Sequence, residues 1–406
     1  MAVERPAAEG SSLPSTVATV LSATAVGASC CQAQRRKRAG RYLGRHGRHV
    51  QCSATATAEA NVVEADALDP AVVSYLKSMF TDVMEVKVPQ RLETFLSVLE
   101  GNGYKLLGKD DWRSIGGDLH PFILPVATKG DMDDDVEVLG LSIRGANGSP
   151  LQPDEYLVVS QRPRLCKQVQ LIAPDIWKYI VLVSEIATFN SEKKDLPIIE
   201  ATKDVYEVRF KGDDRVALDK WLLLEVGPFP SVYANIAEDY LAKGDFQNVS
   251  VVVDTMREEF GTAWGFPHLY QSRVYSQLEG REEEAQHAAQ RCLTGGLPLW
   301  SLQVADKSVD EEGLQNLITE AKLTQHKDLN DLRVFYIKRS TDEQRAAVRT
   351  GSISLGCAAV ARAQAILDAI CCGHKSYKEL RPQLRDMYDE VPGCEPLVEL
   401  INYYIE

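Results

Sequence analysis

Residues 220–230 read Lys-Trp-Leu-Leu-Leu-Glu-Val-Gly-Pro-Phe-Pro and open the region, Lys220 to Leu302, around which the rest of the chain is organised. Apolar residues at helical spacing predict a helix over Val216 to Val226. In this helix we expect Trp221, Leu222 and Leu224 to be buried, with Trp221 at the junction of two domains. The helix should end where the chain is redirected, at Gly227, Pro228, Phe229 and Pro230.

Two helical hairpins are predicted after this turn, because small, aromatic and glycine residues recur there at the spacing of a tetratricopeptide-type repeat. In the first hairpin the pattern is formed by Ala237, Tyr240, Gly244, Asp245, Phe246, Val249, Val253 and Met256. Tyr240 should fill the gap between the two helices, and Gly244 should make the turn. A second turn, at Gly280, follows 36 residues later, against about 34 in the archetype. The repeat is therefore degenerate.

A candidate partner-binding surface follows from this architecture. In such repeats the first helix of each hairpin lines the concave face, which here places Glu238, Tyr270, Arg273 and Gln277 on it. Aromatic and arginine side chains near the centre of a face are the types that dominate interfaces. The alternative for Tyr270 is that it packs between the helices.

The first 52 residues differ in composition from the rest. They contain eight Lys or Arg but only two acids, Glu4 and Glu9, and they are rich in Ser, Thr and Ala. This composition is typical of an organellar transit peptide, and Val50 to Ala54 looks like a plastid processing site. A basic nucleic-acid-binding arm is the alternative. Residues 53–68 should be a disordered linker.

The charge of the remaining chain argues against a nucleic-acid partner. The whole chain carries −13, and removal of the basic segment leaves a more acidic protein that phosphates would repel. No apolar run is long enough to predict a transmembrane segment. Six cysteines outside the segment lack C-x-x-C spacing, and we interpret them as buried thiols, not metal ligands.

Residues 69–215 predict an α+β domain. Asp69 should cap a helix over Pro70 to Thr81, and a second helix should run from Pro89 to Gly101. Alternating residues predict a hairpin of strands at 136–144 and 155–160, with a further strand at 169–172. Asp175 should open another helix, and Val205 to Phe210 should form a strand.

Residues 216–305 comprise the junction helix and the two hairpins, and residues 306–406 read as helices throughout. The predicted fold is thus an α+β amino-terminal domain followed by an all-α, tetratricopeptide-like helical array. Its last helices would cap the array, because the end of a stack must hide its apolar face.

Two segments match known ligand-binding loop motifs only in part. Residues 131–135 begin like a calcium loop but lack the glycine and glutamate that such a loop needs. Residues 103–110 nearly match a phosphate loop, but Asp110 stands where Ser or Thr is required, so we predict a short strand and turn. We predict no catalytic residues, no cofactor and no metal, and an enzyme with a dispersed site in the α+β domain is the alternative.

The chain resembles a plastid family of plants and algae named IN CHLOROPLAST ATPASE BIOGENESIS. The resemblance covers residues 130–305 and is carried by Trp221 to Leu223, Glu225 to Pro230, Gly280-Arg281, Glu284-Ala285, Ala288-Ala289 and Leu297 to Leu302. It implies a non-enzymatic assembly factor in the chloroplast stroma. Its protein partners would be subunits of the chloroplast ATP synthase, in the catalytic head and central stalk. A general scaffold with other plastid clients is the alternative.

Overall fold

The computed structural model describes residues 68–405 apart from 116–117, 131–135, 147, 193–194, 305–308 and 344–354. The predicted transit peptide, almost all of the predicted linker and the acidic stretch 131–135 lie outside the described residues. The described residues fall within one compact unit.

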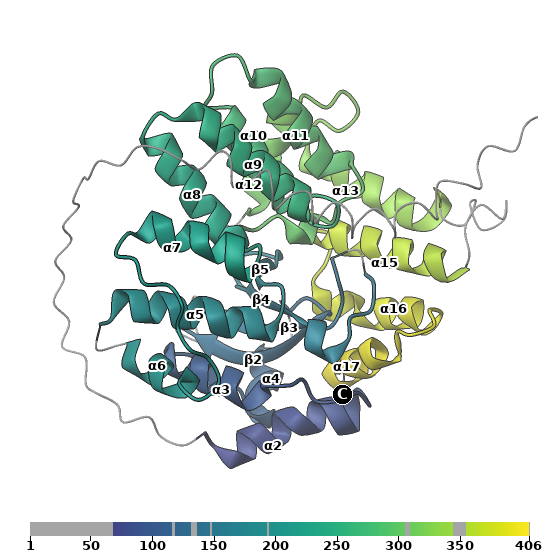
Figure 1. The fold of residues 1–406 in the computed structure, drawn as a ribbon. Coiled ribbons are helices and arrows are strands. Elements are labelled where there is room, and N and C mark those ends of the chain that lie inside the picture. The colour runs from purple at the N-terminus through teal and green to yellow at the C-terminus, as the bar shows by residue number, and fades with distance from the viewer. Residues whose placement is uncertain are drawn as a thin grey trace, which may run out of the picture. The chain divides into compact units, whose positions relative to one another are not determined.

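The amino-terminal part contains a five-stranded antiparallel sheet whose strands lie in chain order (Figure 1). The strands are β1 (Lys105–Leu106), β2 (Ile123–Lys129), β3 (Glu137–Ser142), β4 (Leu157–Gln161) and β5 (Gln170–Ala173). The predicted hairpin is confirmed as β3 and β4, with Leu141 opposite Val158. β5 pairs with β4, as expected. In β2 the register shifts just after Pro125, which has no backbone N–H to donate to a ladder.

The helices of this part pack around the sheet. They are α2 (Pro70–Ser78) with the π-helical turn η1 (Met79–Val83), α3 (Leu92–Gly101), α4 (Lys109–Ile115), the 3₁₀ turn η3 (Pro153–Glu155), α5 (Ile176–Asn190) and α6 (Leu196–Thr202). Both predicted caps are confirmed. The Asp69 carboxylate accepts the N–H of Ala71 at 2.8 Å, and the Asp175 carboxylate accepts that of Lys178 at 2.7 Å. Side-chain oxygens at these positions satisfy helix N–H groups that have no partner within the helix.

The predicted strand at Val205 to Phe210 is wrong. This segment joins no sheet: the N–H groups of Val205 and Tyr206 donate to the Thr202 carbonyl, and later donors go to the buried carboxylate of Glu185. The N–H groups of Arg209 and Phe210 donate to Glu185 at 2.9 and 3.3 Å, and the Tyr206 hydroxyl donates to the same carboxylate.

From residue 215 onward every regular element is helical within the described part of the chain. The elements are α7 (Arg215–Trp221), η5 (Leu222–Val226), α8 (Pro230–Ala242), α9 (Phe246–Phe260), α10 (Phe266–Tyr275), α11 (Glu282–Thr294), η6 (Leu299–Ser301), α12 (Glu311–Ala321), α13 (Leu329–Lys338), η7 (Arg339–Glu343), α15 (Leu355–Cys371), α16 (Tyr377–Asp389) and α17 (Glu395–Ile405). From α8 to α17, each labelled α-helix packs against the next. A small antiparallel sheet with helices, followed by a helical array, is therefore the architecture of the chain.

The two hairpins turn where the glycine pattern predicts. Gly244 and Gly280 have φ values of +69° and +78°, a left-handed conformation that costs glycine less than any residue with a Cβ. Between the helices of the first hairpin Ala237, Val249 and Val253 are fully buried. Tyr240 is only partly buried, and the ammonium of Lys220 lies 5.1 Å from its ring centroid.

The junction helix differs from the prediction in one turn. After α7 the chain continues as the π-helical turn η5, closed by a bond from the Gly227 N–H to the Leu222 carbonyl at 3.1 Å. The wider turn changes the direction of the residues after Leu222. Leu222 is fully buried, but Leu224 is 53% exposed and Trp221 is half-buried, with its ring centroid 6.1 Å from that of Phe210. The expected burial is therefore confirmed for Leu222, wrong for Leu224 and only partly correct for Trp221. Phe229 is buried and precedes Pro230, the first residue of α8.

Truncation of Trp221 should consequently destabilise the protein only moderately. Trp221→Ala is expected to lower the free energy of unfolding by roughly 1–2 kcal/mol, less than the ~3–5 kcal/mol of a fully buried tryptophan. Leu222→Ala, one position along and fully buried, should cost more, about 2–5 kcal/mol. Denaturant unfolding of the two variants checks this order. A larger loss at Trp221 would show that the junction packs more tightly than described.

The last helix returns to the first part of the chain (Figure 1). The Tyr404 ring of α17 stacks on Trp112 of α4 with centroids 5.8 Å apart, and its hydroxyl donates to the carbonyl of Ile123 in β2 at 3.2 Å. The hydroxyls of Tyr403 and Tyr75 in α2 are 3.1 Å apart. α17 thus covers the sheet and the first helices.

Candidate functional site

The predicted partner-binding residues lie on and just after α8 and α10, but only part of the set reaches the surface. Glu238 and Gln277 are exposed, and Arg273 is half-buried. Tyr270 is buried, and its hydroxyl donates to the carbonyl of Ala234 in α8 at 3.2 Å. Its placement on an exposed face is therefore wrong, and the alternative, packing between helices, is correct.

Arg273 also has a charged neighbour on α12. Burial lowers the pKa of Arg273, and the nearby carboxylate of Glu320, exposed on α12, opposes this shift. Gln277 donates to the carbonyl of Arg273 at 2.8 Å. We refer to Glu238, Arg273, Gln277 and Glu320 as the α8–α12 face. Its alternating charges suit a polar partner surface.

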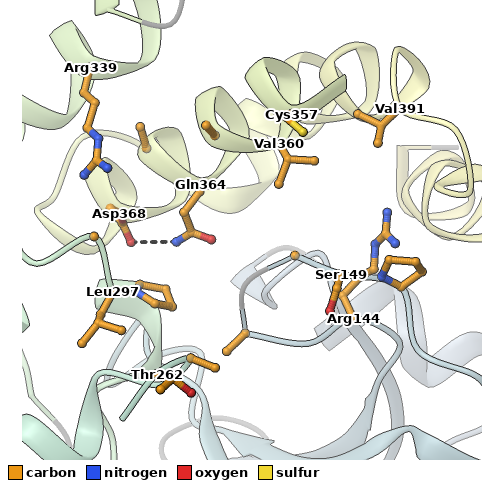
Figure 2. Close-up of a pocket in the computed structure, with 18 of the residues that line it drawn as sticks. Arg144, Ser149, Thr262, Leu297, Arg339, Cys357, Val360, Gln364, Asp368 and Val391 are labelled. Atoms are coloured by element: carbon orange, nitrogen blue, oxygen red, sulfur yellow. Dashed lines mark hydrogen bonds between the residues drawn. The ribbon is translucent and has the colours of Figure 1, made fainter. Parts of the chain in front are cut away.

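A second candidate site is a cavity of about 580 Å³ that the sequence did not predict (Figure 2). It lies between the loop after β3, the segments before α10 and around residue 297, η7, α15 and the turn before α17. The residues that line it are Arg144, Ala146, Gly148, Ser149, Pro150, Thr262, Ala263, Gly296, Leu297, Pro298, Arg339, Cys357, Val360, Ala361, Gln364, Ala365, Asp368, Val391 and Pro392.

Asp368 is the carboxylate among the described residues that line this cavity. Burial raises its pKa to about 7. The carboxylate accepts the Leu299 N–H at 2.7 Å and the Gln364 side-chain amide at 3.0 Å (Figure 2). Asp368 thereby fixes the segment before α12 to α15. A lone acid within the apolar run of residues 355–372 was the signal in the sequence that could have identified it.

Arg144 is the most deeply buried cation of the cavity, with 2% of its surface exposed. One terminal nitrogen donates to the Sγ of Cys394, and its Nε has no hydrogen-bond partner among the described residues. Most buried arginines are paired with an acid, whereas Arg144 forms no ion pair with a described residue.

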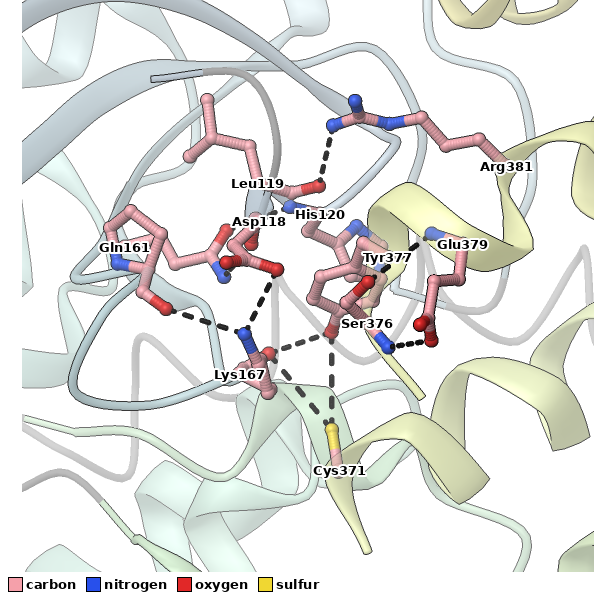
Figure 3. A network of polar contacts seen from close by, with 11 residues as sticks. Asp118, Leu119, His120, Gln161, Lys167, Cys371, Ser376, Tyr377, Glu379 and Arg381 are labelled. Carbon is pink, nitrogen blue, oxygen red and sulfur yellow. Dashed lines mark hydrogen bonds and ion pairs between the residues drawn. The ribbon is translucent and has the colours of Figure 1, made fainter. Parts of the chain in front are cut away.

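A buried polar cluster at the end of α15 joins α16 to loops that flank the sheet (Figure 3). The Tyr377 hydroxyl donates to the Lys167 carbonyl at 2.7 Å, and Arg381 donates to the Leu119 carbonyl at 3.2 Å. His120 accepts the Phe122 N–H at 3.3 Å, and burial, with a smaller effect of the Arg381 charge, keeps its pKa well below the usual value. A neutral, fully enclosed histidine has no route to a substrate, so we interpret this cluster as structural.

The cysteine and loop interpretations can be compared with the structure directly. Cys166, Cys292, Cys371, Cys372 and Cys394 are buried, as expected, but Cys357 is exposed at the cavity. The segment that resembles a phosphate loop contains the short strand β1, as predicted.

Within the described residues no three His, Cys, Asp or Glu side chains gather as metal ligands. Nor does any described helix combine the length and apolar character needed to span a bilayer.

Comparison with known proteins yields one family. A family model described as the PAB middle domain matches residues 230–314. The matched residues run from the first residue of α8 into α12 and include both hairpins. They make up well under half of the chain. No match was found among curated proteins or among solved structures.

Proposed function

We propose that this protein is a non-enzymatic assembly factor of the chloroplast stroma that binds protein subunits through the α8–α12 face. The preferred client is the catalytic head and central stalk of the chloroplast ATP synthase. The observation that carries the proposal is a consecutively packed helical array in which α8 and α12 present the exposed carboxylates of Glu238 and Glu320 and α10 the half-buried guanidinium of Arg273. Tetratricopeptide-like packing of α8 to α11 is part of the same proposal.

The choice of client rests on the resemblance at residues 220–302. The family match falls in the same part of the chain, although its description names neither a client nor an activity. A general scaffold for other plastid proteins would use the same face, and the identity of the captured subunits distinguishes the two.

A charge exchange on the α8–α12 face tests this function. Glu238→Lys combined with Arg273→Glu leaves the net charge unchanged but reverses the sign at both positions. The exchange should reduce recovery of the head and stalk subunits from chloroplast stroma by about tenfold or more, because like charges then meet across the interface. Quantitative mass spectrometry of co-purified proteins measures this, with melting temperature as the check on folding.

The matched control is Lys378→Glu with Glu399→Lys, which exchanges two exposed charges on α16 and α17. It should capture the same subunits as the unaltered protein. If the unaltered protein recovers none of these subunits, the proposed client is wrong. If both exchanges reduce recovery equally, the client binds through general charge and not through this face.

An enzyme remains a second candidate, favoured by the cavity around Asp368. An acid with a pKa of about 7 in a cavity is a frequent feature of catalytic sites, but structural burial also produces one. Here Asp368 holds the Leu299 backbone, and no second carboxylate stands among the described lining residues. Recovery of stoichiometric subunits that is unchanged by Asp368→Asn would favour the assembly factor.

A further inference from the structure

The cavity has the size and lining of a ligand site. Its volume of about 580 Å³ lies within the range of roughly 300–1,000 Å³ that small-ligand pockets occupy. One wall is the apolar face of α15 with Val360, Ala361 and Ala365, and the opposite wall includes Leu297 and Pro298. Such walls favour a ligand with an apolar body.

The described lining of the cavity contains more positive than negative side chains. Figure 2 shows Arg144 and Arg339 extending toward it from opposite sides, with Gln364 and Val360 between them. Neither guanidinium forms an ion pair with a described residue, although the charge of Arg339 acts on Asp368. The Nε of Arg144 lacks a hydrogen-bond partner among the described residues. Asp368 is the one acid of the described lining, and it is already occupied by the Leu299 N–H and the Gln364 amide. Glu395 is near Arg144 but lies at the surface.

A buried cation without an ion-pair partner is costly, and a ligand that supplies a buried negative charge would recover part of the cost. A guanidinium matches a carboxylate in geometry, since its fork of N–H groups can face two oxygens. Arg339, the second guanidinium at the cavity, is only half-buried, so Arg144 is the one fully buried cation among the described lining residues, and a singly charged carboxylate balances it. The apolar walls then select the remainder of the ligand.

We propose that this cavity binds an organic carboxylate with an apolar body, held by the charge of Arg144 and covered by α15. Two sources carry that chemistry: the free carboxyl terminus of an apolar polypeptide segment and a small apolar carboxylic acid. The proposal is independent of the α8–α12 face, because none of the residues of that face lines the cavity.

Three probes distinguish the sources by isothermal titration calorimetry with the full chain. They are N-acetyl-Leu-Val-Leu with a free carboxylate, the same peptide as its carboxyl-terminal amide, and octanoate. The peptide acid is expected to bind at least tenfold more tightly than its amide, because a charged hydrogen bond is lost in the amide. Octanoate binding as tightly as the peptide acid would assign the site to small acids, and weaker octanoate binding would assign it to a polypeptide terminus.

Three variants locate the binding. Arg144→Met removes the buried charge, and Ala361→Phe fills the cavity from α15; each should weaken binding of the preferred acid about tenfold or more. Arg362→Met is the matched control, because Arg362 is adjacent on α15 but pairs with Glu390 at 2.7 Å outside the cavity. It should leave affinity unchanged.

The results decide the proposal even if Arg144→Met fails to fold, since Ala361→Phe and the amide test the same site separately. The proposal is overturned if no probe binds, if the amide binds as well as the acid, or if Ala361→Phe has no effect. Loss of probe binding with normal subunit recovery would leave the proposed assembly function intact, so the two can fail separately.

Discussion

Replacing Trp300 with alanine is expected to lower the free energy of unfolding by about 3–5 kcal/mol. Trp300 is 1% exposed and joins several parts of the chain. Its ring centroid lies 4.3 Å from that of His120 and 5.7 Å from that of Trp264, and its carbonyl accepts the Val169 N–H at 2.7 Å. Truncation would leave a cavity between the sheet and the helical array.

Denaturant unfolding of Trp300→Ala measures this cost, with Trp221→Ala as a control of the same chemistry at a half-buried position. The expected loss at Trp300 is at least twice that at Trp221. Equal losses would mean that the contact between sheet and helices contributes little. The same contacts explain why the segment Leu297 to Leu302 stood out in the sequence: it packs against elements from both parts of the chain.

The second large effect is a dependence of stability on pH that Asp368→Asn removes. In the folded chain burial raises the pKa of Asp368 to about 7, whereas an unfolded aspartate titrates near 3.9. The folded state therefore binds the proton more tightly, so this contribution to stability is fully present below about pH 4 and is lost as the pH rises through 7. At pH 8 the contribution of Asp368 to the free energy of unfolding is lower than below pH 4 by on the order of 4 kcal/mol.

Asparagine does not titrate, and its side-chain carbonyl can accept the same two hydrogen bonds. Between pH 5 and pH 8 the native protein should lose about 2–3 kcal/mol relative to Asp368→Asn. Unfolding free energies of both proteins at the two pH values give this difference, in which the other titrating groups largely cancel. Parallel stability curves would contradict the expectation and place the ionised carboxylate in a better-solvated site.

Local signals in the sequence were sufficient for many elements. Asp69 and Asp175 marked helix starts because a capping side chain acts within three residues of its own position. The apolar residues at 136–144 and 155–160 predicted β3 and β4, both of which are buried along almost their whole length. Glycine turns at 244 and 280 were equally local. These features depend on neighbours along the chain, and so periodicity and composition find them.

The predictions that were wrong concern residues whose contacts lie far away along the chain. Val205 to Phe210 alternates like a strand, but the Glu185 carboxylate of α5 accepts the N–H groups of Arg209 and Phe210. Tyr270 was ambiguous because α10 is buried on almost all sides, and its buried polar residues are paired: Gln271 with Asp254 at 3.0 Å and Ser272 with the Ala285 carbonyl at 2.9 Å. Such a helix has no polar stripe to indicate its exposed side.

The cavity was beyond sequence reasoning for the same reason. Arg144 meets Cys394 across 250 positions, and Asp368 meets Leu299 across 69. No spacing rule connects residues so far apart. Single basic and acidic residues in apolar runs were visible in the sequence, but their assembly around one space required the structure.

The return of α17 to β2 and α4 has a consequence for how the chain is made. A ribosome synthesises the sheet long before Glu395–Ile405 appears, so Trp112 and the carbonyl of Ile123 lack their contacts with Tyr404 during most of translation. Folding of the amino-terminal half should therefore remain incomplete on the ribosome, since contacts that close the longest loops form late and slowly. Nascent chains stalled before residue 395 should be protease-sensitive in β1 to β5 and recruit chaperones. Release of the full chain should bring protection to both ends at once.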